Sequence, residues 1–396
     1  MKQRIILVAV FILILITSCN PTFSVGLEHS SSNTPQPVSA ATDAQSATAV
    51  LSSTNTPIPV TATTLPPTTT ITAVIRRKDP TTSLALVPAI VPSTNPTPPV
   101  YTDDRSSPSQ VIVSLYNAIN RKEYLRAYSY WRNPSSSQGS FASFTEGYKN
   151  TVSVSIVIGQ ITGDAGAGQY YFTVPVALKA VNQDGTHSNY SACYIVHQAQ
   201  PANFGEPPFE PMAIDQGSAV PSALNADDGR VLAAACNGYP TGGSRVDQSV
   251  HNLNIDKSNF LDNRSGPIET VSSFLNALNL KQYVRAYYYF QNPTTYPGPF
   301  DPYAVGYADT DVITATFGPV QSEGAAGSLY HKVPVAMKVR TTTNTMQTFV
   351  GCYTLRLGQP AVQATPPFQP MGIVAGEFSQ VTNGINDIPL LATACK

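Results

Sequence analysis

The sequence predicts an α+β protein built of two tandem cone-shaped modules, each with N-terminal helices packed on a curved, mainly antiparallel sheet of about four strands or more. The first observation is a repeat: residues 110–236 align without a gap on residues 269–395, and about a third of the positions are identical. The second is the pattern of apolar residues: each copy opens with apolar residues at helical spacing. It continues with segments in which apolar and polar residues alternate, separated by turn residues. Helices followed by a run of strands are typical of α+β domains.

The start of each module carries helix signals. Ser107, Pro108 and Gln110 provide an N-cap, a first-turn proline and a capping-box side chain. A second short helix is predicted to end before Asn133-Pro134. The apolar positions that predict the first helix are Val111, Leu115, Ala118 and Ile119.

The rest of each module reads as strands. The glycine-rich stretches 163–168 and 324–327 are predicted to be hairpin turns, because they precede strands and lack a phosphate-loop lysine. Residues 217–235 show no clear pattern and are predicted to be a tail. In the first copy, strands are expected at residues 152–158, 170–181, 189–198 and 209–216.

Residues 1–19 have the features of a targeting segment. Lys2 and Arg4 precede an apolar run that is too short to span a membrane. The run ends in Ile16-Thr17-Ser18-Cys19, which resembles the bacterial lipobox. By this resemblance residues 1–19 are a lipoprotein signal peptide and Cys19 is the lipidated first residue of the mature chain. The alternative is an ordinary secretory signal in which the cysteine occurs by chance.

The segment from residue 20 to residue 104 is rich in Ser, Thr, Pro and Ala and has few aromatic residues. Such a composition buries too little apolar surface to fold, so we expect a disordered stalk. The first module is then assigned to residues 105–236, a polar linker to residues 237–264 and the second module to residues 265–396.

Four cysteines remain after Cys19, and each module holds two of them 43 residues apart. Even numbers of cysteines at repeated spacing in an exported protein predict disulfides. The duplication favours pairing within a module, Cys193 with Cys236 and Cys352 with Cys395. A zinc site is the alternative, but no histidine is repeated beside these cysteines, so we expect neither a metal nor a cofactor.

The chain has a formal net charge of −1, and only 12% of its residues are charged. A protein without a basic surface has no field to gather nucleic acid, so a nucleic-acid partner is not expected. The copies also share few carboxylates: within the aligned regions only Asp228 with Asp387, and Asp164 with Glu323, are matched.

A more specific resemblance comes from motifs that both copies carry. These are Tyr-x-x-Ala-Tyr at residues 124–128 and 283–287, and aromatic-x-x-Gly-Tyr-x-x-Thr at residues 144–151 and 303–310. With the four strands that follow, they resemble the SnoaL-like branch of the nuclear transport factor 2-like superfamily. That resemblance implies a curved sheet wrapped around helices, with an open end that can hold a ligand. The superfamily includes isomerases, dehydratases and hydrolases as well as non-catalytic binding modules.

Eight shared or facing side chains are candidates to line such a pocket. An arginine between tyrosines can stack on an aromatic ring or hold an anion, although it can equally brace the ends of helices. The tyrosines can equally form the core, and the strand residues can equally face solvent. The candidates are Arg126, Tyr128, Tyr130 and His197 in the first copy, and Arg285, Tyr287, Tyr289 and Arg356 in the second.

These observations predict a lipid-anchored protein of the bacterial cell envelope that faces outside the cytoplasm. We expect non-catalytic binding or scaffolding, through the open ends of the cones or the groove between them, with an envelope protein, a glycan or a small molecule as partner. The alternative is an isomerase, dehydratase or hydrolase, which requires an acid-base pair in a pocket. No such pair is evident, and we assign no catalytic residue. An immunoglobulin-like adhesin fits the stalk but not the opening helices.

Overall fold

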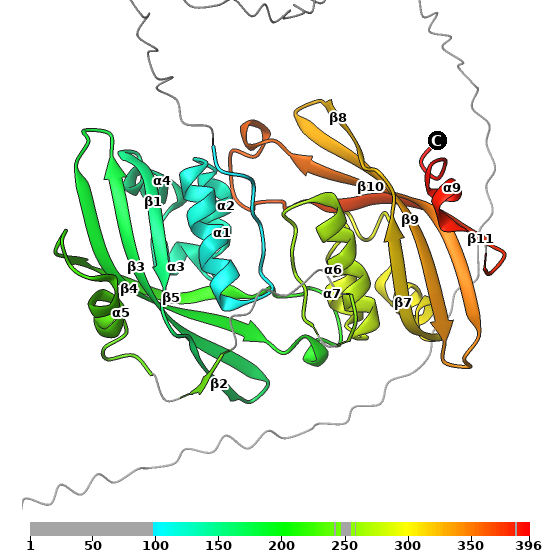
Figure 1. Cartoon of the computed structure of the whole chain (residues 1–396), viewed down its shortest axis with the longest axis horizontal. Helices are drawn as coiled ribbons and strands as arrows, with labels where there is room; N and C mark the ends of the chain where they lie inside the picture. Colours follow the sequence, from blue (N-terminus) through cyan, green and yellow to red (C-terminus); the bar gives the residue numbers. More distant parts are fainter. Residues whose placement is uncertain (1–97, 241–242, 247–254, 258, 385) are drawn as a thin grey trace, which may run out of the picture. The chain divides into compact units, whose positions relative to one another are not determined.

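The computed structural model describes residues 98–240, 243–246, 255–257, 259–384 and 386–396. The targeting segment, Cys19 and nearly all of the expected stalk lie outside the described residues. Two antiparallel sheets and a small number of helices make up the described chain, so the α+β class is confirmed (Figure 1).

The first copy forms a six-stranded sheet with helices at its start and end. Its strands follow the order β5-β4-β3-β2-β6, and β1 also pairs with β3. All of these pairings are antiparallel. The elements are α1 (Pro108–Asn120), α2 (Tyr124–Ser129), α3 (Pro134–Gln138), α4 (Phe141–Gly147), β1 (Thr151–Ile158), β2 (Thr162–Gly166), β3 (Gln169–Asn182), β4 (His187–Ala199), η1 (Pro201–Asn203), β5 (Ala213–Ser222), α5 (Asp228–Ala235) and β6 (Ser244–Arg245).

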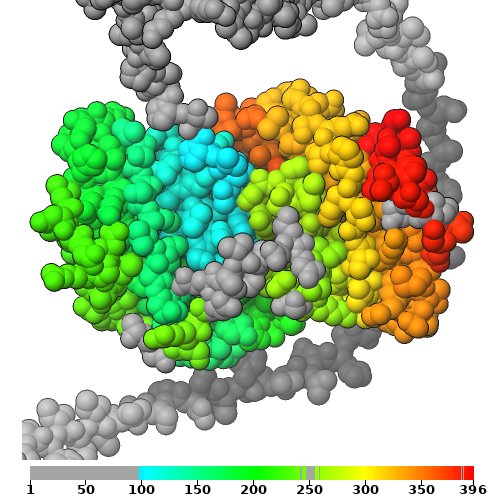
Figure 2. Space-filling model, in the orientation of Figure 1, coloured from blue at the N-terminus to red at the C-terminus, as the bar shows by residue number. Residues whose placement is uncertain are grey.

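The second copy repeats this plan in a five-stranded sheet of order β11-β10-β9-β7, with β8 paired to β9. Its C-terminal helix α9 lies against β9 and β10, where Leu391 packs on Ala336 and Val350 (Figure 2, red on orange). The elements are α6 (Pro267–Asn279), α7 (Tyr283–Tyr287), α8 (Phe300–Gly306), β7 (Thr310–Phe317), β8 (Gln321–Ala325), β9 (Ser328–Thr341), β10 (Met346–Gly358), η2 (Pro360–Val362), β11 (Gly372–Val381) and α9 (Asp387–Leu391).

The opening helix forms where the sequence predicts it. The Ser107 side chain accepts a hydrogen bond from the backbone N–H of Gln110, and Pro108 occupies the first turn. The apolar stripe is fully buried against one face of the sheet, and the alternate residues of β4, including Tyr194 and Val196, complete that core. One face of the sheet is therefore covered by helices α1 and α2.

The last strand of the sheet differs from the expectation. The predicted strand at residues 209–216 is wrong in its limits, because β5 starts only at Ala213. The residues before it include Pro207, Pro208 and Pro211. A proline has no N–H to donate to a sheet, so three prolines within five residues disfavour pairing of this segment with β4. The repeated Pro-Pro-Phe segment instead leads the chain from η1 to the start of β5.

Three further segments depart from the prediction. The glycine-rich stretch 163–168 is mostly strand β2, and only Ala167 and Gly168, with φ of 49° and 75°, make the two-residue turn. The expected tail at residues 217–235 contains the second half of β5 and helix α5. Helices α3 and α4 between the second helix and the sheet were not predicted.

The outer edge of strand β1 is closed by a side chain from the end of α1. The Asn120 side chain accepts a hydrogen bond from the N–H of Val154 at 2.7 Å and donates one to the carbonyl of Val154 at 2.9 Å. Asn279 repeats both bonds with Ile313. An exposed strand edge is a template for pairing with other chains, so this amide protects the edge in both copies. The shared asparagine is therefore structural.

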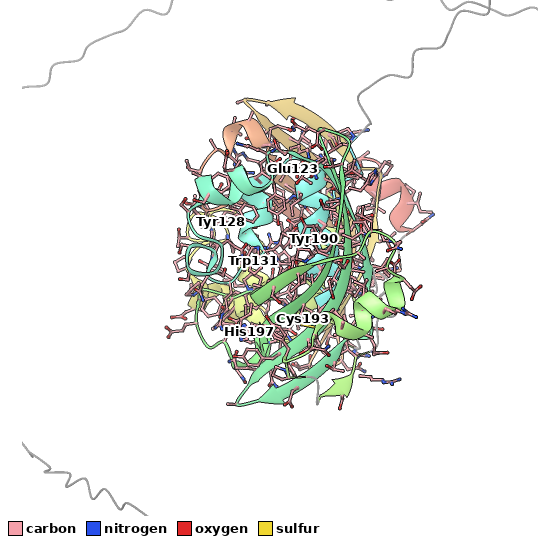
Figure 3. The ribbon with its side chains drawn as sticks, turned by 90° about the vertical axis from the view of Figure 1, so that its left-hand side faces the viewer. Glu123, Tyr128, Trp131, Tyr190, Cys193 and His197 are labelled. Atoms are coloured by element: carbon pink, nitrogen blue, oxygen red, sulfur yellow. A yellow bond between two sulfur atoms is a disulfide. The ribbon has the colours of Figure 1, made fainter. Side chains whose placement is uncertain are left out.

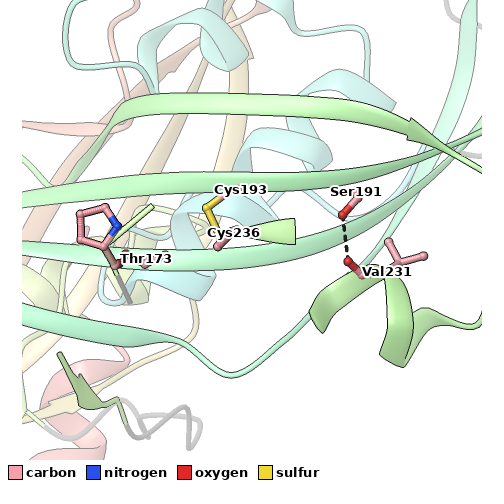
Figure 4. The surroundings of a disulfide bond; sticks show 6 residues. Thr173, Ser191, Cys193, Val231 and Cys236 are labelled. Carbon is pink, nitrogen blue, oxygen red and sulfur yellow. Dashed lines mark hydrogen bonds between the residues drawn. A yellow bond between two sulfur atoms is a disulfide. The ribbon is translucent and has the colours of Figure 1, made fainter. Parts of the chain in front are cut away.

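The predicted disulfides are both present, Cys193 to Cys236 and Cys352 to Cys395. Cys193 lies within β4 and faces away from the helices, and Cys236 follows α5. Beside the bond, the Ser191 hydroxyl donates to the carbonyl of Val231 at 2.8 Å (Figure 4). These two links, together with the ion pair between Asp228 of α5 and Lys179 of β3 at 2.8 Å, hold α5 on the outer face of the sheet.

The two modules meet through short segments that exchange hydrogen bonds symmetrically. The N–H of Arg105 donates to the carbonyl of Asp262 at 2.7 Å, and the N–H of Arg264 donates to the carbonyl of Asp103 at 2.6 Å. Arg264 and Asp262 are the repeat counterparts of Arg105 and Asp103, so the exchange has a pseudo-twofold character. Residues 101–104 and 259–264 therefore belong to the folded part, which corrects their assignment to the stalk and the linker.

Asp104 lies at the centre of this junction, opposite its counterpart Asn263. Its carboxylate accepts the N–H of Ser106 at 2.8 Å and the amide of Asn263 at 3.3 Å. Burial, with smaller contributions from the nearby carboxylates of Asp262 and Asp103, raises the pKa of Asp104 to about 6. The folded state therefore binds this proton more tightly than the unfolded chain does.

A pH dependence of stability follows. Because the folded-state pKa of Asp104 exceeds its ordinary value, the stability tied to this group is present below about pH 4 and is lost as the pH rises through 6. Asp104→Asn should remove this loss, because asparagine is the residue that the second copy uses. At pH 7 the variant should gain roughly 1–3 kcal/mol in the free energy of unfolding, since one pKa unit corresponds to about 1.4 kcal/mol.

Urea denaturation of wild type and variant between pH 4 and pH 8 measures this difference. The two stability curves should diverge between pH 4 and pH 6. Parallel curves over that range would contradict a titrating Asp104 at the junction. Asn263→Asp provides the opposite change, and it should steepen the loss of stability with rising pH.

Candidate ligand pocket

The first module contains an open pocket of about 490 Å³ between its helices and the inner face of its sheet. Tyr116 comes from α1, Tyr148 from the end of α4, and Tyr190 and Tyr194 from alternate positions of β4. None of the lining side chains carries a charge at neutral pH. The lining residues are Tyr116, Gln138, Ser143, Phe144, Gly147, Tyr148, Asn150, Thr151, Val154, Leu178, Ala180, Asn182, Tyr190, Tyr194 and Ala219.

A pair of phenols forms a polar contact on the wall of this pocket. The hydroxyls of Tyr116 and Tyr194 lie 2.5 Å apart, and both rings are almost completely buried. Each phenol therefore satisfies the other. The pocket thus offers aromatic rings and apolar side chains together with uncharged hydroxyl and amide groups, which is the usual composition of a small-molecule site.

Three tyrosines of the pocket, Tyr116, Tyr148 and Tyr194, stay protonated at physiological pH. Burial raises the pKa of Tyr194 to about 12, and burial also raises the pKa values of Tyr116 and Tyr148 above their usual range. A general acid or base works best with a pKa near the operating pH. These phenols can hold a ligand by hydrogen bonds, but they cannot exchange protons efficiently with it near pH 7.

The second module fills the equivalent space with its own side chains. Phe378 stands where the first copy has Ala219, and its ring packs on Tyr353 at 4.6 Å. Tyr296 stands where the first copy has Ser137, and its hydroxyl donates to the carbonyl of Gly376 at 3.0 Å. Both added rings pack on the second core. These two rings therefore occupy space that the smaller Ala219 and Ser137 leave open in the first copy.

Two of the three predicted arginines, Arg126 and Arg285, lie buried beside the junction and outside this pocket. Arg126 donates to Asn117 at 2.9 Å, to Glu123 at 2.7 Å and to the carbonyl of Thr102, with its guanidinium over the ring of Tyr101 at 4.4 Å. It lines a separate cavity.

Arg285 repeats this arrangement in the second copy. It donates to Asn276, to Gln282 and to the carbonyl of Leu261, and its guanidinium stacks on Phe260. In both copies the arginine links the helix pair to the segment that enters the module.

The four predicted tyrosines make internal hydrogen bonds. Tyr128 and Tyr287 donate to the carbonyls of Gly139 and Gly298, at 2.6 and 2.7 Å. Tyr130 and Tyr289 are fully buried and donate to the carboxylates of Asp103 and Asp262, at 2.7 and 2.8 Å. None of the four lines the pocket around Tyr116, Tyr148, Tyr190 and Tyr194, called the tyrosine pocket below. Tyr128 borders a different cavity, near the junction.

His197 and Arg356 do not point toward the pocket. His197 is two positions from Ile195 and four from Cys193, on the strand face opposite to Tyr194. Tyr190, Cys193 and His197 follow one another along β4 (Figure 3). His197 is buried against the Tyr171 ring and bonds the side chain of Gln169, and burial lowers its pKa.

Arg356 occupies the matching position in the second copy and donates to Gln291 at 3.1 Å. Neither His197 nor Arg356 therefore forms part of a carboxylate–histidine pair at the pocket.

The prediction missed two buried carboxylates that the copies share. Asp103 and Asp262 are 3% and 2% exposed, and each is bonded by a core tyrosine. They lie upstream of the aligned region, in Tyr101-Thr-Asp-Asp-Arg-Ser106 and Phe260-Leu-Asp-Asn-Arg-Ser265. Extending the repeat by ten residues with the same offset would have found them.

Other kinds of site are not evident in the described chain. No group of three or more His, Cys, Asp or Glu side chains among the described residues could hold a metal ion. Within the described ranges, no helix is long and apolar enough to cross a membrane.

Comparisons with known proteins add no assignment. No protein-family model, curated protein or solved structure matches the chain.

The phenol pair gives a test of the pocket wall. Tyr116→Phe should lower the free energy of unfolding by about 1–2 kcal/mol, because the Tyr194 hydroxyl is left buried without a partner. Adding Tyr194→Phe should restore part of that loss, since both polar groups are then gone. Urea denaturation of the two single variants and the double variant measures the coupling. Strictly additive losses would show that the hydroxyls do not depend on each other.

Proposed function

We propose that this protein is a lipid-anchored, non-catalytic binding protein of the bacterial envelope, and that its first module holds a small neutral ligand in the tyrosine pocket. The observation that carries the proposal is the contrast between the copies. The same fold leaves an uncharged aromatic pocket open in one copy and fills it with Phe378 and Tyr296 in the other.

The chemistry of the pocket defines the ligand class. The ring faces of Tyr148, Tyr190 and Phe144 suit an apolar or sugar face, and phenol and amide groups suit hydroxyl or carbonyl groups. A charged ligand would lose its hydration without gaining an opposite charge, which is unfavourable. We therefore assign a glycan fragment or a small neutral ring compound.

Catalysis has no support among the pocket residues. The enzymes of the superfamily that the sequence resembles need a carboxylate or histidine in the cone, and neither occurs among the lining residues. The helix-lined sheet of each copy is compatible with the cone-shaped modules of that superfamily. Our proposal places this chain among its binding modules.

The second module then has a structural role. Its core is closed by added rings, and it contributes to the junction with the first module. A filled, disulfide-linked module next to a binding module is suited to present that module at a fixed distance and orientation.

The location rests on two features. The disulfides indicate an oxidising compartment outside the cytoplasm. The lipobox-like sequence around Cys19 supports attachment by acyl chains, each contributing about 0.8 kcal/mol per buried methylene.

Ligand binding can be tested with a variant that copies the second module. The chain from residue 20 onward, which omits Cys19 and its lipid, would be screened by saturation-transfer NMR against neutral monosaccharides, disaccharides and phenolic compounds. Ala219→Phe should weaken any bound compound at least tenfold, because phenylalanine at this position occupies the open space as Phe378 does. Phe378→Ala is the matched control and should not weaken binding. A ligand held equally by wild type and Ala219→Phe would refute the pocket assignment.

Membrane attachment can be tested separately. Cys19→Ala in the full chain, expressed in a bacterium, should move the protein from the membrane fraction to the soluble or secreted fraction, because no thiol is left to receive an acyl chain. Membrane fractionation with and without high salt measures this. Continued salt-resistant membrane association would exclude Cys19 as the anchor.

A further inference from the structure

The junction between the modules is pseudo-symmetric in its backbone but not in its side chains. On one side, Phe209 packs against Phe204 at 5.2 Å and against Tyr288 of the second module at 5.5 Å. Phe209 is only 6% exposed as a result. This half of the junction is filled by three aromatic rings from the protein itself.

The other half lacks two of these three rings. Phe368 is the counterpart of Phe209, but Gln363 replaces Phe204 and Ser129 replaces Tyr288. The Gln363 side chain donates to the carbonyl of Gly358 at 2.9 Å and borders the larger cavity at this place, without supplying an aromatic ring. Phe368 is left half-buried.

A groove occupies the place of the missing rings. Two cavities of about 270 and 520 Å³ meet there, and both are bordered by Leu125 and Phe368. The groove continues the established contact between the modules. Its other walls are mainly aromatic, aliphatic and proline side chains, among them Tyr124, Trp131, Phe141, Leu329, Leu357 and Pro367.

The charged side chains along the groove favour a partner that carries a negative charge. The larger cavity is bordered by Arg121, Lys122 and Arg126 but by only one carboxylate, Glu123. In the smaller cavity, two aspartates balance two arginines. The excess is therefore positive, and it attracts an acidic group near the aromatic part of the groove.

We propose that this groove is a docking site for a partner protein that inserts an aromatic side chain next to an acidic residue. The filled half of the junction shows the chemistry that the geometry accepts: aromatic rings packed on a phenylalanine, one of them Phe204 from an extended, proline-containing loop. A partner segment supplies in the open half what Phe204 and Tyr288 supply in the filled half. This site is separate from the tyrosine pocket and does not depend on it.

The test uses a variant that fills the open half. In Ser129→Tyr the first module receives the residue that the second module carries at Tyr288. Its ring should pack on Phe368, with Arg105 above it as Arg264 lies above Tyr288 at 4.7 Å. The backbone carbonyls of residues 129 and 288 already accept equivalent arginine bonds, at 3.0 and 3.1 Å, so the exchange fits the local structure.

The probe is the peptide acetyl-Phe-Asp-amide, titrated into the chain from residue 20 onward. The sole tryptophan, Trp131, borders the groove, so its fluorescence reports binding, with saturation-transfer NMR as the second readout. Acetyl-Leu-Asp-amide is the control peptide. We expect the phenylalanine peptide to bind at least tenfold more tightly than the leucine peptide, and Ser129→Tyr to weaken it at least tenfold.

Two further variants make the result decisive. Phe368→Ala removes the aromatic wall and should also weaken peptide binding. It replaces Ser129→Tyr if circular dichroism shows that the tyrosine variant does not fold. Ala219→Phe fills the tyrosine pocket and should leave peptide binding unchanged. The proposal is overturned if wild type does not bind the peptide, if neither groove variant weakens it, or if Ala219→Phe alone abolishes binding.

Discussion

The described structure depends on a buried network of aspartate, arginine and tyrosine at the start of each module. Asp103 accepts the hydroxyl of Tyr130 from the core, while Arg105 stacks on the same ring at 4.4 Å and donates to the carbonyl of Met212 at 2.9 Å. One short segment thus joins the helices to the chain that enters β5. Its backbone also pairs with the equivalent segment of the other module. Burying such charges is unfavourable unless each is paired, which explains why every one of them has a defined partner.

That network is duplicated, and it leaves the copies free to diverge elsewhere. Arg264, Asp262 and Tyr289 repeat the contacts of the first copy almost bond for bond. One difference is that Phe260 replaces Tyr101, so an oxygen of Asp262 has no partner that corresponds to the Tyr101 hydroxyl. The pocket and the junction groove differ far more. Because this network holds each copy together, the space beside the sheet can be open in one copy and occupied by side chains in the other, and the two halves of the junction can differ in the same way.

Much of the fold could be predicted because it rests on local rules. The helix capped by Ser107, its buried stripe and the pairing of Cys193 with Cys236 follow from capping, periodicity and repeated spacing. The start of β5 could not be located, because alternation continues through a proline-rich segment that does not pair with the sheet. The junction was hidden for another reason: Asp103-Asp-Arg-Ser106 is as polar as the stalk before it. Only its pairing with the second module shows that it is buried.

The candidate site, like the fold, could be predicted only in part. The sequence identified tyrosines that the copies share, such as Tyr128 and Tyr130, but it could not tell which of them form the core and which face a cavity, since both roles use the same side chains. Tyr128 and Tyr130 turned out to be internal. Tyr116 and Tyr190, which border the pocket with Tyr148 and Tyr194, were not among the candidates, because the second copy does not repeat them. Whether this space is open depends on the volume at facing positions such as Ala219 and Phe378.

By itself, the sequence determined the duplication, the α+β class, the disulfides and the scarcity of charge, because each of these is written in composition, spacing or local periodicity. The tertiary structure decided which face of β4 meets the helices, which arginines are braces and where space remains. These properties depend on which residues far apart in the chain come into contact. The volume of a cavity and the burial of a side chain are set by all the neighbouring residues together, so they cannot be predicted from a single sequence.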